Sequence, residues 1–215
     1  LCDIPDGETG IDARPSTDQP RPSFLMFHRW LSHLSSCVLF LWVLIAGSSP
    51  KAQTPEMPAP LGIPKPGPTN SAPYSPQPIV QGGIILPLYP PDSPRLRADR
   101  IREAEHYNLS KSVPGRISWI TNIHNPSIEV HTVEGGLNTG AAVILCAGGG
   151  HRTLKVGSES ADFVAYFHQY GVSTIILRNR LRADGYDVQK DAVEDALEAI
   201  RRVRAHAANW NIDPR

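Results

Sequence analysis

The sequence predicts an α/β fold in which parallel strands alternate with crossover helices. One unbroken apolar run, residues 141–147, suits a strand that is covered on both faces, and residues 172–177 are expected to form a second buried strand. A helix is predicted between them over 158–170, and apolar residues recur at helical spacing over 188–209. Strand, helix, strand, helix is the order of a parallel sheet with right-handed crossovers.

The helix over 188–209 is supported by two patterns. Acidic residues crowd its first half and arginines its second, which suits the helix macrodipole. The arginines could indicate a phosphate site, but we interpret them as a solvated basic face. Its core-facing residues are expected to be Val193, Ala196, Leu197, Ile200, Val203 and Ala207.

Two further strands are expected before this unit. Residues 117–123 and 127–133 are β-rich, and the second run alternates apolar with polar residues. We therefore expect an antiparallel hairpin at an edge of the sheet, with His131 on its polar face. His124 and His131 could suggest a metal pair, but no partner ligand is evident. We interpret both as solvated histidines and predict no metal site.

The first 98 residues are predicted to lie outside the globular part. Residues 1–25 read as a disordered or mis-assigned leader, and 26–52 as a signal peptide with an apolar run that ends in small residues. The expected location is therefore secreted or periplasmic, with membrane attachment only through an uncleaved signal. Thirteen of the 21 prolines fall within residues 53–98, which predicts a disordered linker before a domain over 99–215.

Charge and cysteine content exclude several classes of partner. Lysine plus arginine and aspartate plus glutamate both number 21, so the formal net charge is zero. This balance gives no support to nucleic-acid binding or to polybasic membrane binding. The three cysteines show no metal or redox spacing, and no cofactor is predicted.

The glycine run Gly148-Gly149-Gly150-His151 directly follows the apolar run 141–147. Ligands of open α/β sheets bind at the carboxyl ends of the strands, and glycine lets the backbone approach them closely. The run lacks the third glycine of a dinucleotide fingerprint, and Lys155-Val156 does not complete a phosphate loop. An oxyanion hole and a tight turn without a ligand both remain open from the spacing alone.

Four segments together resemble one family. The glycine run resembles the oxyanion motif of α/β-hydrolase esterases, in particular the acetylxylan-esterase-like and feruloyl-esterase-like branch. Residues 177–181 resemble the strand end of that branch, 191–204 resemble its following helix, and 210–214 resemble the phrase before its nucleophile strand. The resemblance covers 99–215; Ala147 and His151 depart from the residues common in the family.

The resemblance implies that the chain forms the N-terminal half of an α/β-hydrolase sheet. It also implies a substrate class, ester-bearing carbohydrate such as acetylated xylan. It gives a role, oxyanion binding, to Gly149 and Gly150, with Gly148 and His151 as further candidates. The 215 residues contain no G-x-S-x-G nucleophile elbow, so no catalytic residue is predicted. The expected function is a partial carboxylic-ester hydrolase, inactive without its Ser-Asp-His triad; the alternative is a non-catalytic secreted binding module. Truncation at this point would expose strand 141–147 as a sheet edge.

Overall fold

The computed structural model describes residues 59–63 and 72–215, which belong to one compact unit. The predicted leader and signal peptide lie outside the described residues, as do 53–58 and 64–71 of the predicted linker. No helix of the described part has the length and apolar character needed to span a membrane.

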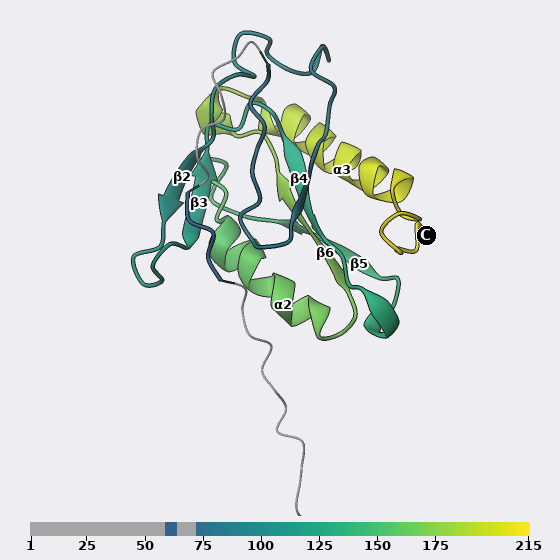
Figure 1. Ribbon diagram of the computed structural model, residues 1–215. Coiled ribbons are helices and arrows are strands. Elements are labelled where there is room, and N and C mark those ends of the chain that lie inside the picture. Colours follow the sequence, from purple (N-terminus) through teal and green to yellow (C-terminus); the bar gives the residue numbers. More distant parts are fainter. Residues whose placement is uncertain (1–58, 64–71) are drawn as a thin grey trace, which may run out of the picture. The chain divides into compact units, whose positions relative to one another are not determined.

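A four-stranded mixed sheet has the order β1-β4-β6-β5 (Figure 1). Its central strand β4 runs antiparallel to both β1 and β6, whereas β5 runs parallel to β6. A π-helical turn and the helix α2 connect β5 to β6, as predicted for a crossover, so the α/β class is confirmed. The strands are β1 (Ile84–Pro87), β4 (Ser127–His131), β5 (Ala142–Cys146) and β6 (Ser173–Arg178).

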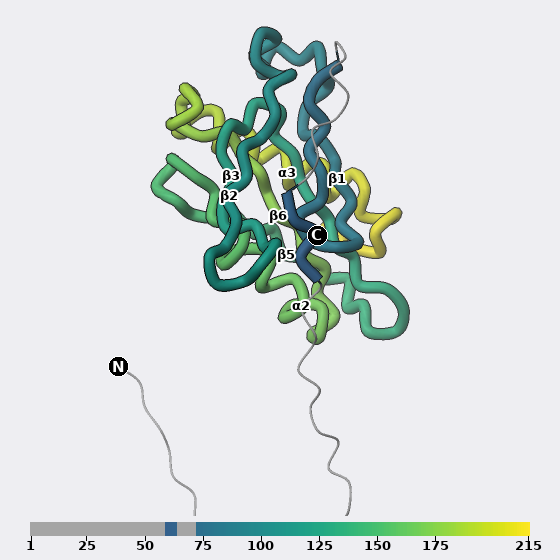
Figure 2. The backbone as a smooth tube through the Cα atoms, turned by 60° about the vertical axis from the view of Figure 1, so that its left-hand side comes forward, coloured from purple at the N-terminus to yellow at the C-terminus, as the bar shows by residue number. Residues whose placement is uncertain are grey.

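The predicted hairpin is wrong in its pairing. Strand β3 (Ile117–Thr121) pairs with β2 (His106–Leu109) in a separate two-stranded sheet, and the two lie side by side in Figure 2. Asn122, with φ at 60°, turns the chain away after β3, and β4 then enters the interior of the main sheet. All five residues of β4 are buried, including His131, because both of its faces are covered. Ile128 and Val130 lie in the cluster with α3, and residues 79–83 lie against Glu129 and His131 on the other face.

The predicted linker is wrong for residues 72–98, which pack onto the sheet. Ile79, Val80 and Leu88 are buried, and β1 lies within this stretch. Prolines fit here because β1 is an edge strand and the segment before it is extended, so few ladder hydrogen bonds are required. The packed part of the domain therefore includes residues 72–98 as well as 99–215.

Helices cover the two faces of the sheet. Figure 1 shows α2 (Asp162–His168) and α3 (Val193–Ala205) on opposite sides of it. Ala199 and Val203 of α3 pack in the cluster that contains Ile128 and Ile175, and Val164 of α2 packs in the cluster that contains Ile176. The short helical turns are η1 (Gly135–Leu137), η2 (Gly157–Ala161), η3 (Arg182–Asp184) and η4 (Val188–Ala192).

Both predicted helices exist, but their regular α-helical parts are shorter than expected. Each begins with a π-helical turn, and α3 ends at Ala205 rather than near 209. Of the residues expected to face the core from α3, Val203 is buried whereas Val193, Leu197 and Ile200 are exposed. The predicted apolar stripe is therefore only partly covered: Ala196 packs against the core and Ala207 is buried, whereas the three large side chains of Val193, Leu197 and Ile200 are 38 to 51% exposed.

Candidate functional site

The glycine run lies where the sequence placed it, at the carboxyl end of β5. The strand ends at Cys146, and the loop that follows returns to the second sheet, where Leu154 exchanges backbone hydrogen bonds of 2.9 Å in both directions with Ile120. Lys155 N–H donates to the Gly148 carbonyl at 2.9 Å and closes the loop at its base. The loop is therefore anchored at both ends by main-chain hydrogen bonds.

One of the three glycines is required by space. A Cβ on Gly149, whose φ is 137°, would lie 2.1 Å from the Thr153 carbonyl oxygen. A Cβ on Gly148 would meet only the end of the Glu159 side chain, at 2.9 Å, and that flexible side chain can move aside. Gly150 has a φ of 62° but open space around it, so only its backbone conformation favours glycine.

Of the four main-chain N–H groups of residues 148–151, one donates a hydrogen bond and three have no acceptor in the described part of the chain. Gly148 N–H donates to Glu159 Oε2 at 2.6 Å. The next three N–H groups, of Gly149, Gly150 and His151, donate to no acceptor in the described part of the chain. Successive free N–H groups in a turn with left-handed residues form a concave site for an anion. The loop can therefore offer N–H groups to a developing oxyanion, which is the predicted chemistry.

His151 contributes its backbone to this loop. Its φ is 59°, its side chain is exposed, and its carbonyl accepts a hydrogen bond of 3.2 Å from Ala183 N–H. That bond ties the loop to the segment after β6. All four candidate residues thus lie in one loop that is tied both to β3 and to the segment after β6.

No nucleophile and base are brought together beside the loop. Within residues 59–63 and 72–215, no serine or cysteine side chain forms a hydrogen bond with a histidine. Ser160, in the run Gly157-Ser158-Glu159-Ser160 that follows the loop, is fully buried. The described residues also contain no group of three or more His, Cys, Asp or Glu side chains that could hold a metal ion.

The two histidines considered as a metal pair are buried instead of solvated, which corrects the prediction. The His124 ring bonds to the Tyr186 hydroxyl at 2.8 Å and to Asn122 Oδ1 at 2.9 Å, and burial lowers its pKa. His131 Nε2 lies 2.9 Å from Glu129 Oε1. Each ring is thus held by its own structural partners.

A buried charge cluster around Arg178 was missed by the sequence reasoning. The guanidinium of this fully buried residue lies 3.0 Å from Glu105 Oε2 and 2.5 Å from Glu129 Oε2. Burial raises the pKa of Glu105. Burial acts in the same direction on Glu129, but the contacts with His131 and Arg178 outweigh it and lower the pKa of that carboxyl. An arginine at the end of an otherwise apolar buried strand was the available signal.

The same cluster fastens the segment that the sequence assigned to a linker. Glu129 accepts hydrogen bonds from Ile79 N–H and Val80 N–H at 3.0 to 3.1 Å, and Arg178 donates to the Gln77 carbonyl at 2.7 Å. These main-chain groups have no strand partner, so the buried side chains satisfy them. The cluster is therefore a structural fastening.

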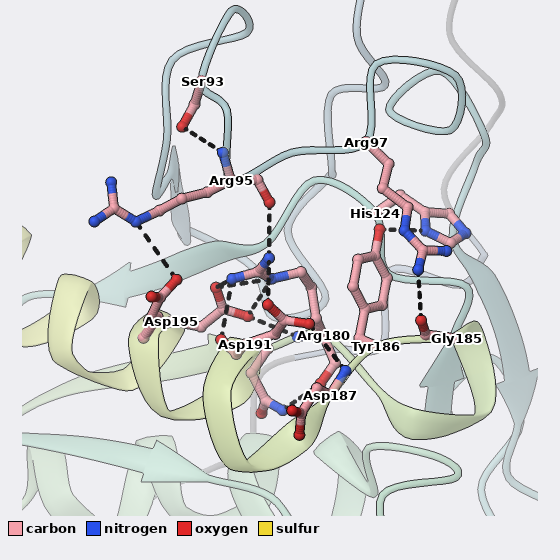
Figure 3. A network of polar contacts seen from close by, with 12 residues as sticks. Ser93, Arg95, Arg97, His124, Arg180, Gly185, Tyr186, Asp187, Asp191 and Asp195 are labelled. Carbon is pink, nitrogen blue, oxygen red and sulfur yellow. Dashed lines mark hydrogen bonds and ion pairs between the residues drawn. The ribbon is translucent and has the colours of Figure 1, made fainter.

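Arg180, two residues further on, forms a second network, shown in Figure 3. Its guanidinium contacts both carboxylate oxygens of Asp195 at 2.7 to 3.1 Å, and Asp195 also accepts the Arg180 backbone N–H at 2.9 Å. Arg180 thus holds the chain after β6 onto α3, whereas Arg178 binds the segment before β1, and neither arginine side chain hydrogen-bonds to the glycine loop. On α3 itself, Arg201 and Arg202 pair with Glu198, which agrees with a solvated basic face.

Comparisons with known proteins identify partial structural similarity to esterases. Neither the family models nor the curated proteins contain a match. An acetyl ester-xyloside bifunctional hydrolase from Caldicellulosiruptor lactoaceticus is similar at 21% identity and a TM-score of 0.41, over 61% of this chain and 39% of that chain. A thermophilic esterase from the Planctomycetes species Thermogutta terrifontis is similar at 25% identity and a TM-score of 0.38, over 43% of this chain and 33% of that chain. The chain thus spans less than half the length of either protein.

Proposed function

We propose that this chain supplies the oxyanion-binding half of a carboxylic-ester hydrolase site. The observation that carries the proposal is the row of three free N–H groups, of Gly149, Gly150 and His151, at the carboxyl end of β5. The strand and its anchored loop hold these donors in place before any ligand arrives, and such preorganisation is what makes oxyanion holes effective.

The chemistry would be acyl transfer from an ester. A serine hydroxyl attacks the carbonyl carbon, the carbonyl oxygen becomes an oxyanion, and backbone N–H groups donate to it while the alcohol leaves. The chain's own part in this step is the donation of these hydrogen bonds. The motif resemblance supports ester-bearing carbohydrate, of the acetylxylan type, as the substrate class.

The nucleophile, acid and base would have to come from residues other than those brought together here. The 215 residues contain no G-x-S-x-G elbow, and no serine–histidine hydrogen bond forms in the described part of the chain. We therefore expect residues 1–215 alone to leave p-nitrophenyl acetate unhydrolysed. Hydrolysis that a serine-directed inhibitor abolishes would contradict this expectation.

Secretion is part of the same proposal. Residues 26–52 have the basic start, apolar run and small residues of a signal peptide. We expect export to a secreted or periplasmic location, with cleavage near residue 47 or 52. Expression of the full chain with a C-terminal epitope in a bacterial host tests this: the mature product should be recovered outside the cytoplasm and should lack Met26.

The oxyanion loop itself can be tested without turnover. Backbone amide resonances of the ¹⁵N-labelled chain are followed while methylphosphonate, a tetrahedral oxyanion mimic, is added. The amides of Gly149, Gly150 and His151 should shift together, and that of Gly148 should shift least because Glu159 occupies it. Chloride at the same ionic strength is the control. Equal shifts across the loop and the rest of the chain would contradict an oxyanion site.

The second candidate function is a non-catalytic secreted binding module. It is favoured by one observation: the outer edge of β5, beyond which no described strand lies, and the exposed apolar residues Val193, Leu197 and Ile200 of α3 offer a surface for another protein. If the loop amides do not shift and the chain still associates with another protein through this surface, the binding module is favoured over the hydrolase half.

A further inference from the structure

The first glycine of the loop, Gly148, is held through both of its main-chain groups. Its carbonyl accepts a hydrogen bond of 2.9 Å from Lys155 N–H, and its N–H donates to Glu159 Oε2 at 2.6 Å. Glu159 N–H in turn donates to the Lys155 carbonyl at 3.1 Å, so both partners of Gly148 belong to one turn of the chain. The three free N–H groups, of residues 149–151, follow directly after this fixed point.

The Glu159 side chain has little else to hold it in place. Among the described residues, its contacts are the Gly148 N–H and an ion pair with Lys155 Nζ at 4.0 Å, and the side chain is 41% exposed. Fixing an exposed glutamate in one rotamer costs conformational entropy. A hydrogen bond from a backbone N–H to a carboxylate is stronger than one between neutral groups and can offset that cost. The Gly148 N–H is therefore the contact that orders the carboxylate.

Glycine at position 148 leaves room for this contact. A Cβ there would lie 2.9 Å from Glu159 Oε2, the same atom that accepts the N–H, so any larger residue would push the carboxylate away. Gly149 and Gly150 have φ values of 137° and 62°, whereas Gly148 has no such left-handed backbone. What glycine provides at 148 is thus the approach of the Glu159 carboxylate.

The contact also decides which N–H groups a ligand meets. It occupies the Gly148 N–H and fixes the peptide from which the next three N–H groups extend. Without it, the loop would present four free N–H groups and would have one anchor fewer. Donors that a ligand must first order bind it less tightly than donors held in place beforehand.

We propose that Glu159 is a positioning residue of the glycine loop: its carboxylate holds the Gly148 N–H and thereby presents the N–H groups of residues 149–151 to an oxyanion. This inference rests on the proposed function of the loop. Glu159 acts on the ligand through Gly148 and does not itself touch it.

The test compares Glu159→Gln with Glu159→Ala in the full chain, by the methylphosphonate titration described above. Both variants remove the negative charge, so the difference between them reports the hydrogen bond. The side-chain oxygen of glutamine still accepts from the Gly148 N–H, whereas alanine leaves that group free. We expect Glu159→Ala to bind methylphosphonate about tenfold more weakly than Glu159→Gln. Glu159→Gln should bind at least as tightly as the unaltered chain, because it keeps an acceptor and removes a like charge beside the anion.

The Gly148 amide resonance separates positioning from a general loss of structure. In the unaltered chain and in Glu159→Gln it should shift least when methylphosphonate is added, whereas in Glu159→Ala it should shift together with those of residues 149–151. The matched control is Glu194→Ala on α3, because the Glu194 side chain is similarly exposed, 34% against 41%, and forms a long ion pair of 3.5 Å with Arg95. The control should bind methylphosphonate as the unaltered chain does, and circular dichroism checks that every variant is folded.

Gly148→Ala tests the same contact without changing Glu159, and supplies the measurement if Glu159→Ala fails to fold. Its Cβ displaces the carboxylate, so methylphosphonate binding should weaken. Because both substitutions break one contact, the double variant should bind like Glu159→Ala alone.

Three results would overturn the proposal and leave the proposed function intact. These are equal binding by Glu159→Ala and Glu159→Gln, a Gly148 amide that stays unresponsive in Glu159→Ala, and additive losses in the double variant. A different result, no shift of the loop amides in the unaltered chain, would overturn the proposed function itself and the role of Glu159 with it.

Discussion

The two edges of the main sheet are built in opposite ways. On the β1 side, Pro87 ends a four-residue edge strand, and the chain before it is fastened by the buried carboxylate of Glu129 and by Arg178. On the β5 side, no described strand lies beyond Ala142–Cys146, and Val193, Leu197 and Ile200 of the neighbouring helix α3 are 38 to 51% exposed. The β1 edge is completed by buried polar groups of the same chain. The outer edge of β5 has no comparable fastening among the described residues.

The largest effect is expected from the Arg178 cluster. Arg178→Met removes the cation and leaves the buried carboxylates of Glu105 and Glu129 without it. Breaking a buried ion pair from one side costs about 3–5 kcal/mol, so the free energy of unfolding in urea should fall by that amount. Arg201→Met, on the exposed face of α3, is the control and should change it by less than about 0.5 kcal/mol. Similar losses in both variants would show that the β1 side is not fastened as described.

The glycine loop provides a second comparison, within the β5 side. Gly149→Ala places a Cβ 2.1 Å from the Thr153 carbonyl oxygen and at a φ of 137°, so both overlap and backbone strain oppose it. We expect a loss of about 2–4 kcal/mol in the free energy of unfolding. Gly150→Ala meets open space and requires only a left-handed backbone, which costs about 1–2 kcal/mol. Equal losses, measured in the same urea titrations, would mean that the close approach at Thr153 is absent in solution.

The Glu129 carboxyl makes the β1 side sensitive to acid. Its pKa in the folded chain lies below the ordinary value of 4.5, so the ionised carboxylate contributes stability that is complete above pH ~4.5. That contribution is lost as the pH falls through the folded pKa. The raised pKa of Glu105 acts with the opposite sign, so the two must be separated by substitution. As the pH is lowered from ~4.5, the free energy of unfolding of Glu129→Gln should fall less than that of the unaltered chain. Parallel stability curves would contradict this assignment.

The smallest effect on the folded chain is expected from the exposed α3 row. Leu197 is 47% exposed, so Leu197→Lys should change the free energy of unfolding by less than about 0.5 kcal/mol. Urea titrations of the variant and the unaltered chain measure this difference. A much larger loss would mean that the Leu197 side chain is packed against the rest of the chain in solution.

The α/β class and the central strands were predictable because continuous apolar runs have few alternatives. Residues 172–177 contain no polar alternation, and the strand found there, Ser173–Arg178, is buried along its whole length. The glycine run was equally visible, since its position after a strand and its spacing are local properties. The four candidate residues consequently lie together where the sequence placed them.

The errors arose where distant residues decide the structure. The alternation in 127–133 suggested an exposed face, but β1 and β6 cover both edges of β4, and Glu129 is buried against Arg178. The prolines of 72–98 suggested a disordered linker, but the carboxylate that holds Ile79 N–H and Val80 N–H lies about 50 positions further along the chain. No local pattern reports a partner at that separation.

One hydrogen bond described above also constrains how the chain folds. Arg178 donates to the Gln77 carbonyl across 101 positions of sequence, and β4 must already lie between β1 and β6 when it does so. Closing so long a loop has an entropic cost that is recovered only after the contact forms, and folds rich in such contacts fold slowly. The Arg178 fastening should thus complete late in folding, and until then the segment before β1 is exposed to proteases.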